Sequence, residues 1–199
     1  MTHRSALRLF AIALAASVQS AEASAQTTLQ TTLLDCAYAP RGGGEMQTFN
    51  NCATKDAQGQ VHLAPQRLSQ LSYDSNKLAG VYVECWYYLA RDGRSAAVVA
   101  FDNGPDPFAD GLARSPVGDK VGYIDRHLRL VIPAQFDGAF PFEHGQAAVC
   151  VGCRATSDGE HSSYAGGQWG CIDRRGQLVT ALHDAAGYVP CASPGRSGP

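Results

Sequence analysis

Two cysteines with Cys-x-x-Cys spacing, Cys150 and Cys153, give this chain its clearest potential for chemistry. That spacing serves structural disulfides, redox dithiols and zinc centres. A redox dithiol normally starts a helix inside a βαβ unit, and the sequence around Cys150 predicts neither element. A zinc centre needs about four ligands, and His161 and Cys171 are the residues that would complete one. We therefore favour structural disulfides and keep a metal or thiol-redox site on these four residues as the alternative.

The number of cysteines supports this preference. The chain has seven, and thiols at such a density usually pair outside the cytoplasm. The order of cysteines in a sequence does not fix their pairing. The residues expected to take part are Cys36, Cys52, Cys85, Cys150, Cys153 and Cys171.

Two bridges are suggested by the expected strands. Cys171 opens a strand that should pair with the strand ending at Cys150 or Cys153. A bridge from Cys171 to one of those two would clamp the base of the segment between them. Cys36 and Cys52 would form a second bridge, which closes the weakest repeat.

An odd number leaves at least one cysteine without a partner in the chain, and we expect this to be Cys191. It lies in segment 189–199, whose content of Pro, Gly and Ser is typical of a disordered tail. Such a thiol would stay free or would bond another molecule.

The polar, glycine-rich segment 152–167 is a second candidate for function. Loops that project from a rigid scaffold often carry binding residues. The plainer interpretation is an elongated hairpin without a function of its own. The residues placed to contact a partner are Asp158, Glu160, His161 and Tyr164.

The same segment holds Ser162 and Ser163 beside His161 and Asp158, the residue types of a hydrolase. A nucleophilic serine needs a strained turn such as G-x-S-x-G, or an equally rigid setting. A soft glycine-rich loop does not provide one. We therefore expect no catalytic residues, no cofactor and no enzymatic activity.

The elements that must position these residues repeat along the chain. An eight-residue phrase occurs three times, as Trp86–Gly93, Val121–Leu128 and Trp169–Gly176. The first two copies start 35 residues apart and the last two 48 apart, so 152–167 is an insertion into a regular series. A weaker copy at 52–85 lacks the opening aromatic residue. Internal repetition of this kind predicts stacked units that share a core.

Each copy has the pattern of β-structure rather than of helix. The phrase is short, rich in β-forming residues and ends in a turn signature, and the residues after it predict a returning strand. No window of ten or more residues shows the apolar spacing of an amphipathic helix. We expect an all-β fold of short antiparallel hairpins or three-strand repeats of about 35 residues, stacked side by side.

Two further sets of residues recur with the repeat. Aspartate side chains accept hydrogen bonds from their own turn backbone, so we expect the recurring aspartates to cap turns rather than to act as acids. The large aromatic residues are expected to anchor the core, with an exposed aromatic row for a glycan or peptide as the alternative. The aspartates are Asp125, Asp137 and Asp173, and the aromatic residues are Trp86, Tyr123 and Trp169.

The repeat resembles the bacterial WG-repeat family, which is named after a Trp-Gly pair. The matching stretches are 122–125, 131–133, 136–137, 142–147 and the pair Trp169-Gly170. The resemblance covers residues 86–180 and implies an all-β, repeat-built fold. The family has no common catalytic residues to carry over, and the roles of its members are mostly unassigned or thought to be binding. This chain departs from the pattern in its few copies, many cysteines and long insert.

The N-terminal residues 1–25 have the order of features of a secretory signal peptide. Arg4 and Arg8 precede a short apolar run, and Ala23-Ser-Ala25 fits a cleavage site. The run is too short for a membrane span, which needs about 20 apolar residues, and no span is expected later. We therefore expect a periplasmic or secreted protein.

The expected organisation follows from these boundaries. After the signal peptide come an N-terminal segment (26–51), a degenerate repeat (52–85), a repeat (86–120), a repeat with the insert 152–167 (121–168), a partial repeat (169–188) and a tail (189–199). Removal of Arg4, Arg8 and Glu22 with the signal takes the formal charge from −2 to −3, which gives nucleic-acid binding little electrostatic support. We expect a non-catalytic module that binds a protein or a cell-envelope component.

Overall fold

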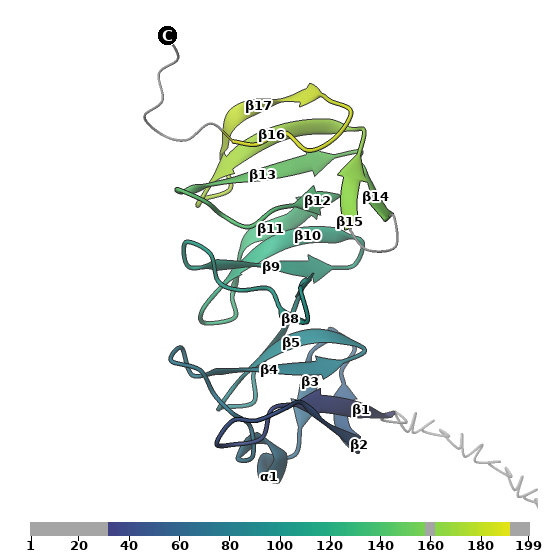
Figure 1. Ribbon diagram of the computed structural model, residues 1–199, viewed down its shortest axis with the longest axis vertical. Coiled ribbons are helices and arrows are strands. Elements are labelled where there is room, and N and C mark those ends of the chain that lie inside the picture. Colours follow the sequence, from purple (N-terminus) through teal and green to yellow (C-terminus); the bar gives the residue numbers. More distant parts are fainter. Residues whose placement is uncertain (1–31, 158–161, 192–199) are drawn as a thin grey trace, which may run out of the picture. The chain divides into compact units, whose positions relative to one another are not determined.

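The computed structural model describes residues 32–157 and 162–191, and nearly all of its regular structure is β-strand (Figure 1). The expected signal peptide, the tip of the insert and residues 192–199 lie outside the described residues. Within them, the one helix is the single turn α1 (Pro65–Leu68). The prediction of an all-β fold of short antiparallel strands is confirmed.

The strands form four antiparallel meanders of three strands each, which we call units one to four. Unit one contains β1 (Leu33–Tyr38), β2 (Gln47–Lys55) and β3 (Val61–Leu63), and unit two contains β4 (Leu78–Val83), β5 (Cys85–Ala90) and β6 (Ser95–Val98). Unit three contains β9 (Leu112–Val117), β10 (Lys120–Asp125) and β11 (Leu130–Phe136), and unit four contains β13 (Gln146–Val151), β16 (Gln168–Asp173) and β17 (Leu178–Asp184). The repeated phrase supplies the middle strand of units two to four, and the first strand comes from the end of the preceding copy.

Short pairs of strands connect or extend these units. They are β7 (Ala100–Phe101) with β8 (Gly104–Pro105), β12 (Gly138–Ala139) alongside β13, and β14 (Arg154–Ser157) with β15 (Ser162–Ala165). Units one and two share one six-stranded sheet, in which β1 pairs with β4. Units three and four form separate sheets. Unit three meets unit two through side chains and through one backbone bond, from the Val99 N–H to the Arg114 carbonyl (3.1 Å), rather than through a ladder.

The three largest hydrophobic cores each lie between two units. One is shared by units one and two, one by units two and three, and one by units three and four. Neighbouring residues of a strand point to opposite faces. In β10, Tyr123 therefore packs in the core with unit four, while Ile124 packs in the core with unit two. Each middle unit is buried on both faces by its neighbours.

A buried ion pair between Asp106 and Arg114 lies at the junction of units two and three. Asp106 is 1% exposed and Arg114 is 8% exposed. The Arg114 backbone N–H donates to Asp106 Oδ2 (2.7 Å), its Nε donates to Oδ1 (3.1 Å), and its Nη1 donates to the Ala139 carbonyl (3.2 Å). The Tyr88 hydroxyl of unit two donates to the Asp106 carbonyl (3.1 Å). These bonds fix unit three against both the unit before it and the strand that follows.

The recurring aspartates cap turns at two of the three predicted positions. Asp125 Oδ1 accepts from the backbone N–H groups of His127 (2.8 Å) and Arg129 (3.0 Å). Asp173 Oδ1 likewise accepts from the backbone N–H groups of Arg175 and Gln177, two and four residues further along the chain. The prediction is wrong for Asp137, which follows a strand instead of opening a tight turn and bonds a different part of the chain.

Two of the three predicted core aromatic residues are confirmed. Trp169 and Tyr123 are fully buried. Trp86 is only half-buried, so its prediction as a core anchor is wrong in part. It lies next to the β4–β5 turn, with its ring edge-on to the 43%-exposed Tyr82 at 5.6 Å.

The glycine of the phrase is explained by a close approach of two backbones. A Cβ atom on Gly122 would lie 2.4 Å from the Ile132 carbonyl oxygen, and one on Gly170 would lie 2.7 Å from the Thr180 carbonyl oxygen. The ladder to the returning strand shifts register at both glycines. Unit two has Tyr87 at this place, and its β5–β6 ladder is regular. The irregular pairing, rather than the turn, therefore excludes a side chain.

We predict that Gly122→Ala destabilises the protein by about 1–3 kcal/mol, the usual cost of forcing extra atoms into packed structure. Urea unfolding followed by circular dichroism measures this loss. Gly104→Ala is the matched control, because the nearest atom to a Cβ there is 4.0 Å away. Equal stability of the two variants would contradict the explanation.

Candidate binding site at the insert

The insert forms the hairpin β14–β15, which extends from one side of unit four (Figure 1). Its ladder pairs Arg154 with Ala165 and Ala155 with Tyr164. The hairpin lies between β13 and β16, where unit two has a one-residue turn at Glu84 and unit three a two-residue turn at 118–119. The insertion therefore enlarges a turn within unit four and leaves the meander itself intact.

A disulfide fixes the chain where it leads into the hairpin. Cys150 and Cys153 form a disulfide, and they are 0% and 6% exposed. On the other strand, a Cβ on Gly167 would lie 2.4 Å from the Cys153 backbone nitrogen, so only glycine fits this approach. The indole N–H of Trp169 donates to the Gly166 carbonyl (2.8 Å). The two ends of the hairpin are thus held close together.

Asp137 ties the same base to unit three. Its Oδ2 accepts from the Gly152 backbone N–H (2.7 Å), and its Oδ1 accepts from Lys120 Nζ, which is also its ion-pair partner. The bond from Lys120, and then the bond from the Gly152 amide, hold the pKa of Asp137 below its usual value. The carboxylate is therefore kept charged by the contacts that it makes at the hairpin base.

An aromatic cluster packs against the hairpin. The centre of the Phe140 ring lies 6.0 Å from the ring centres of Tyr164 and Trp169 and 4.4 Å from that of Tyr188. Tyr164 is half-buried and packs closely over Gly138. Tyr164 therefore positions the hairpin as well as being a candidate contact. The other candidates, Asp158, Glu160 and His161, lie outside the described residues.

The C-terminal segment 185–191 covers the far face of unit four. Ala185 and Val189 pack against the buried Cys150 and Trp169. The segment is joined to the hairpin end, where the Gly166 N–H donates to the Ala186 carbonyl (2.7 Å). It occupies the face on which a further unit would pack, so it acts as the cap of the series.

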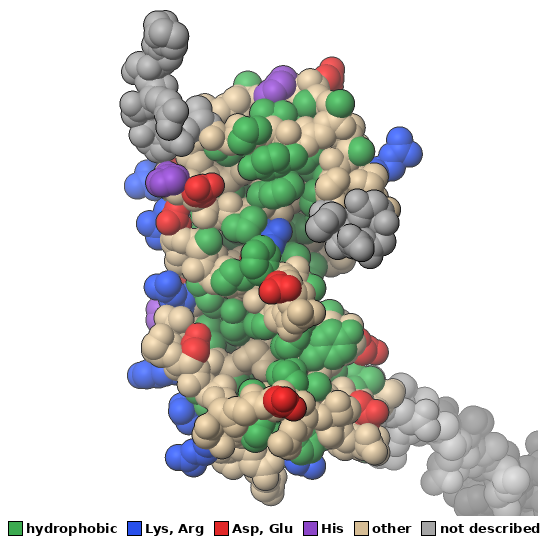
Figure 2. Space-filling model, viewed as in Figure 1, with side chains coloured by type: hydrophobic (Ala, Val, Ile, Leu, Met, Phe, Trp, Pro, Cys, Tyr) green, Lys and Arg blue, Asp and Glu red, His purple; other side chains and the backbone are tan. Residues whose placement is uncertain are grey.

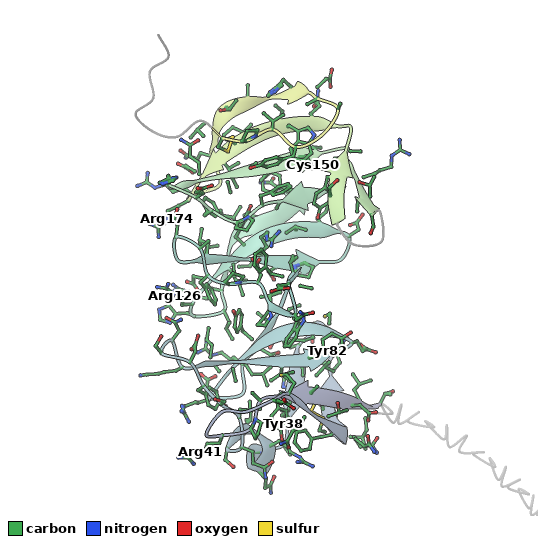
Figure 3. All side chains as sticks on the ribbon, in the orientation of Figure 1. Tyr38, Arg41, Tyr82, Arg126, Cys150 and Arg174 are labelled. Atoms are coloured by element: carbon green, nitrogen blue, oxygen red, sulfur yellow. A yellow bond between two sulfur atoms is a disulfide. The ribbon has the colours of Figure 1, made fainter. Side chains whose placement is uncertain are left out.

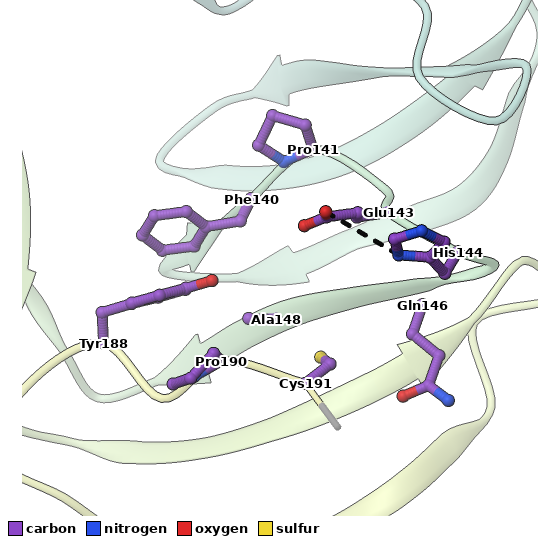
Figure 4. A pocket seen from close by; sticks show the side chains of 9 residues that line it. All are labelled: Phe140, Pro141, Glu143, His144, Gln146, Ala148, Tyr188, Pro190 and Cys191. Carbon is purple, nitrogen blue, oxygen red and sulfur yellow. Dashed lines mark ion pairs between the residues drawn. The ribbon is translucent and has the colours of Figure 1, made fainter. Parts of the chain in front are cut away.

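A small pocket of about 60 Å³ lies between this cap and unit four (Figure 4). Phe140 and Tyr188 form its apolar side, and Glu143 and His144 form its polar side. Glu143 Oε1 and His144 Nδ1 are 3.7 Å apart. The pocket has room for water-sized molecules only.

The disulfides correct part of the expected pairing. The bridge Cys36–Cys52 is confirmed. Cys171 bonds to Cys191 rather than to Cys150 or Cys153.

Strand register explains the difference. Cys171 lies opposite Ala148, while Cys150 lies opposite Trp169, so the two cysteines are diagonal neighbours. Diagonal positions are about 7–8 Å apart, at or beyond the Cα spacing of about 4.4–6.8 Å that a disulfide requires. The returning cap instead brings Cys191 to a Cα distance of 5.8 Å.

The prediction of Cys191 as the unpaired thiol is therefore wrong. The free cysteine is Cys85, which is half-buried at the start of β5. Residues 189–191, assigned from composition to the tail, belong to the described fold and hold the cap in place. No feature of the sequence marks Cys85 as the odd residue, because the choice depends on where the chain returns.

The expected alternative of a zinc site is not supported. Cys150, Cys153 and Cys171 are all in disulfides, and His161 lies outside the described residues. Across 32–157 and 162–191, no three His, Cys, Asp or Glu residues are grouped to hold a metal ion. Oxidised sulfurs do not supply the thiolates that zinc binds.

The fold and site describe an all-β repeat protein with disulfide-held ends. Residues 122–152 match the family model described as WG containing repeat. This segment runs from the middle strand of unit three to the end of the first strand of unit four and so covers most of one copy of the repeat. No curated protein and no solved structure matches the chain. In the described part of the chain, none of the helices has the length and apolar character to cross a membrane.

We predict that peptide mapping under non-reducing conditions recovers the pairs Cys36–Cys52, Cys150–Cys153 and Cys171–Cys191. Alkylation before reduction should label Cys85 alone, since it is the one cysteine without a sulfur partner. A Cys85→Ser variant should lose that label and keep all three bridges. Recovery of Cys171 joined to Cys150 would contradict the strand register given above.

Proposed function

We propose that this chain is an exported, non-catalytic binding module whose partner is a protein or another component of the cell envelope. The observation that carries the proposal is the fixed base of the β14–β15 hairpin. A disulfide, the Asp137 carboxylate and an aromatic cluster all hold that base. Holding the two strands of a hairpin in one place lowers the entropic cost of binding through them.

Two observations support export. The N-terminal 25 residues have the features of a signal peptide. Three disulfides join six of the seven cysteines, and such bonds persist in oxidising compartments such as the periplasm and the extracellular space. We therefore place the mature protein outside the cytoplasm.

A thiol-redox role on Cys150 and Cys153 is the weaker candidate. Exchange requires a thiolate to reach one sulfur of the disulfide. Cys150 is 0% and Cys153 is 6% exposed, and both pack against Trp169. Their burial favours a structural role in holding the hairpin.

We predict that the hairpin is the part of the molecule nearest to the partner in cells. A photo-crosslinking residue at the exposed Ser163 should give an adduct with an envelope component, and one at Thr180, exposed on β17, should not. Replacing Asp158, Glu160 and His161 together by glycine should weaken the Ser163 adduct about tenfold, because losing a few central contacts typically costs that much or more. The base residues stay unchanged in that variant.

Three results would contradict the proposal. An adduct of equal strength from Thr180 would show that the hairpin has no special role. An unchanged Ser163 adduct after loss of the three side chains would exclude the tip as the contact. Recovery of uncleaved protein in the cytoplasmic fraction would exclude export.

A further inference from the structure

The turns at one edge of units two to four gather positive charge. The sixth position of the repeated phrase is arginine in all three copies, Arg91, Arg126 and Arg174. The turns at 90–94, 125–129 and 173–177 together hold six arginines and three aspartates. Their net charge is +3, in a chain whose formal net charge is −2. Figure 2 shows Lys and Arg side chains following this edge, and Figure 3 shows Arg126 and Arg174 on it. We call it the cationic edge.

Forming the turns does not require these arginines. The turn backbones are capped by Asp125 and Asp173, as described above. The guanidinium of Arg91 lies 4.1 Å from the centre of the Tyr73 ring, and that of Arg126 lies 5.9 Å from the centre of the Phe108 ring. All three arginines of the sixth position remain exposed.

The charges along this edge are only partly neutralised. Asp92 pairs with Arg94, and Asp125 pairs with Arg129. Within the described residues, no carboxylate lies within ion-pair distance of Arg91, Arg126, Arg174 or Arg175.

An open groove of about 540 Å³ runs between the turns of units two and three. The charged residues that line it are Lys77, Arg91, Arg94 and Arg126, with Asp92 as the one carboxylate. Arg94 Nη1 donates to the His127 carbonyl (2.7 Å), so the two turns are joined across the groove. Stacked sheets lie about 10 Å apart, which places the next arginine of the series one layer further along. The edge therefore presents a row of cations rather than a single anion pocket.

We propose that the cationic edge binds a linear anionic polysaccharide. Guanidinium groups bind carboxylates and other oxyanions through paired N–H donors, and a row of them complements an extended polyanion. The choice of a polysaccharide rests on the proposed export, which puts the chain among envelope polymers. Single-stranded nucleic acids are bound largely by stacking on open aromatic rings, whereas Tyr73 and Phe108 already lie beneath arginines. This edge is separate from the β14–β15 hairpin.

The test is fluorescence anisotropy with fluorescein-labelled polygalacturonate on purified mature protein. Because each cation near an anionic surface contributes about 1 kcal/mol, Arg91→Gln, Arg126→Gln and Arg174→Gln together should weaken binding by about a hundredfold. The triple change Arg41→Gln, Lys55→Gln and Arg67→Gln removes equal charge outside both the edge and the hairpin and should change binding by less than about twofold. Circular dichroism checks that each variant is folded. If the Gln variant of the edge is unfolded, the corresponding Arg→Lys variant, which keeps the charge, is measured in its place.

Several results would overturn the proposal. Equal losses in the two Gln variants would show that net charge, not the edge, determines binding. Tighter binding to single-stranded DNA or to phosphatidylglycerol vesicles than to polygalacturonate would assign the edge to another class of partner. Absence of binding by the unaltered protein at low salt would remove the proposal while leaving export and the hairpin contact to their own tests. Cytoplasmic location with intact polymer binding would instead overturn the proposed function and the reason for choosing a polysaccharide.

Discussion

The constraint on which this structure depends is that a three-stranded meander has two faces and no interior. Alternate residues of its middle strand need two different neighbours, as Tyr123 and Ile124 of β10 show by packing in different cores. Burying one such side chain contributes about 1.5–3 kcal/mol, and that contribution is available only when the adjacent unit is in place. The bonds around the buried pair of Asp106 and Arg114 add to this dependence, because Tyr88 of unit two donates to the Asp106 backbone carbonyl and Arg114 Nη1 donates to the Ala139 carbonyl.

The two ends of the series meet the constraint differently. Unit one joins unit two edge to edge, and together they enclose one core. Unit four is closed by the segment 185–191, which the Cys171–Cys191 disulfide fastens over its far face. Both β faces of the middle units are used for stability. The features left to contact other molecules are therefore at the margins, namely the enlarged turn of unit four and the row of turns that forms the cationic edge.

Local rules predicted much of this fold. The strands, the capped turns at Asp125 and Asp173 and the Cys36–Cys52 bridge all follow from short-range pattern. The pairing of Cys191 and the cationic edge do not follow from short-range pattern, because they depend on where the chain returns and on which turns share an edge. A net charge of −2 for the whole chain conceals a local excess of arginine. The half-exposure of Trp86 also depends on packing between distant parts of the chain. The phrase position of Trp86 matches that of the buried Trp169, so the sequence predicts burial for both.

The most direct test of shared cores uses the two tryptophans of the chain, Trp86 in unit two and Trp169 in unit four. Labelling with 5-fluorotryptophan gives one ¹⁹F signal from each, so both units can be followed in a single protein during a urea titration. If every unit depends on its neighbours, both native signals disappear at the same urea concentration in one cooperative transition. Loss of one native signal while the other persists would show that the units hold their own cores, which would contradict this account.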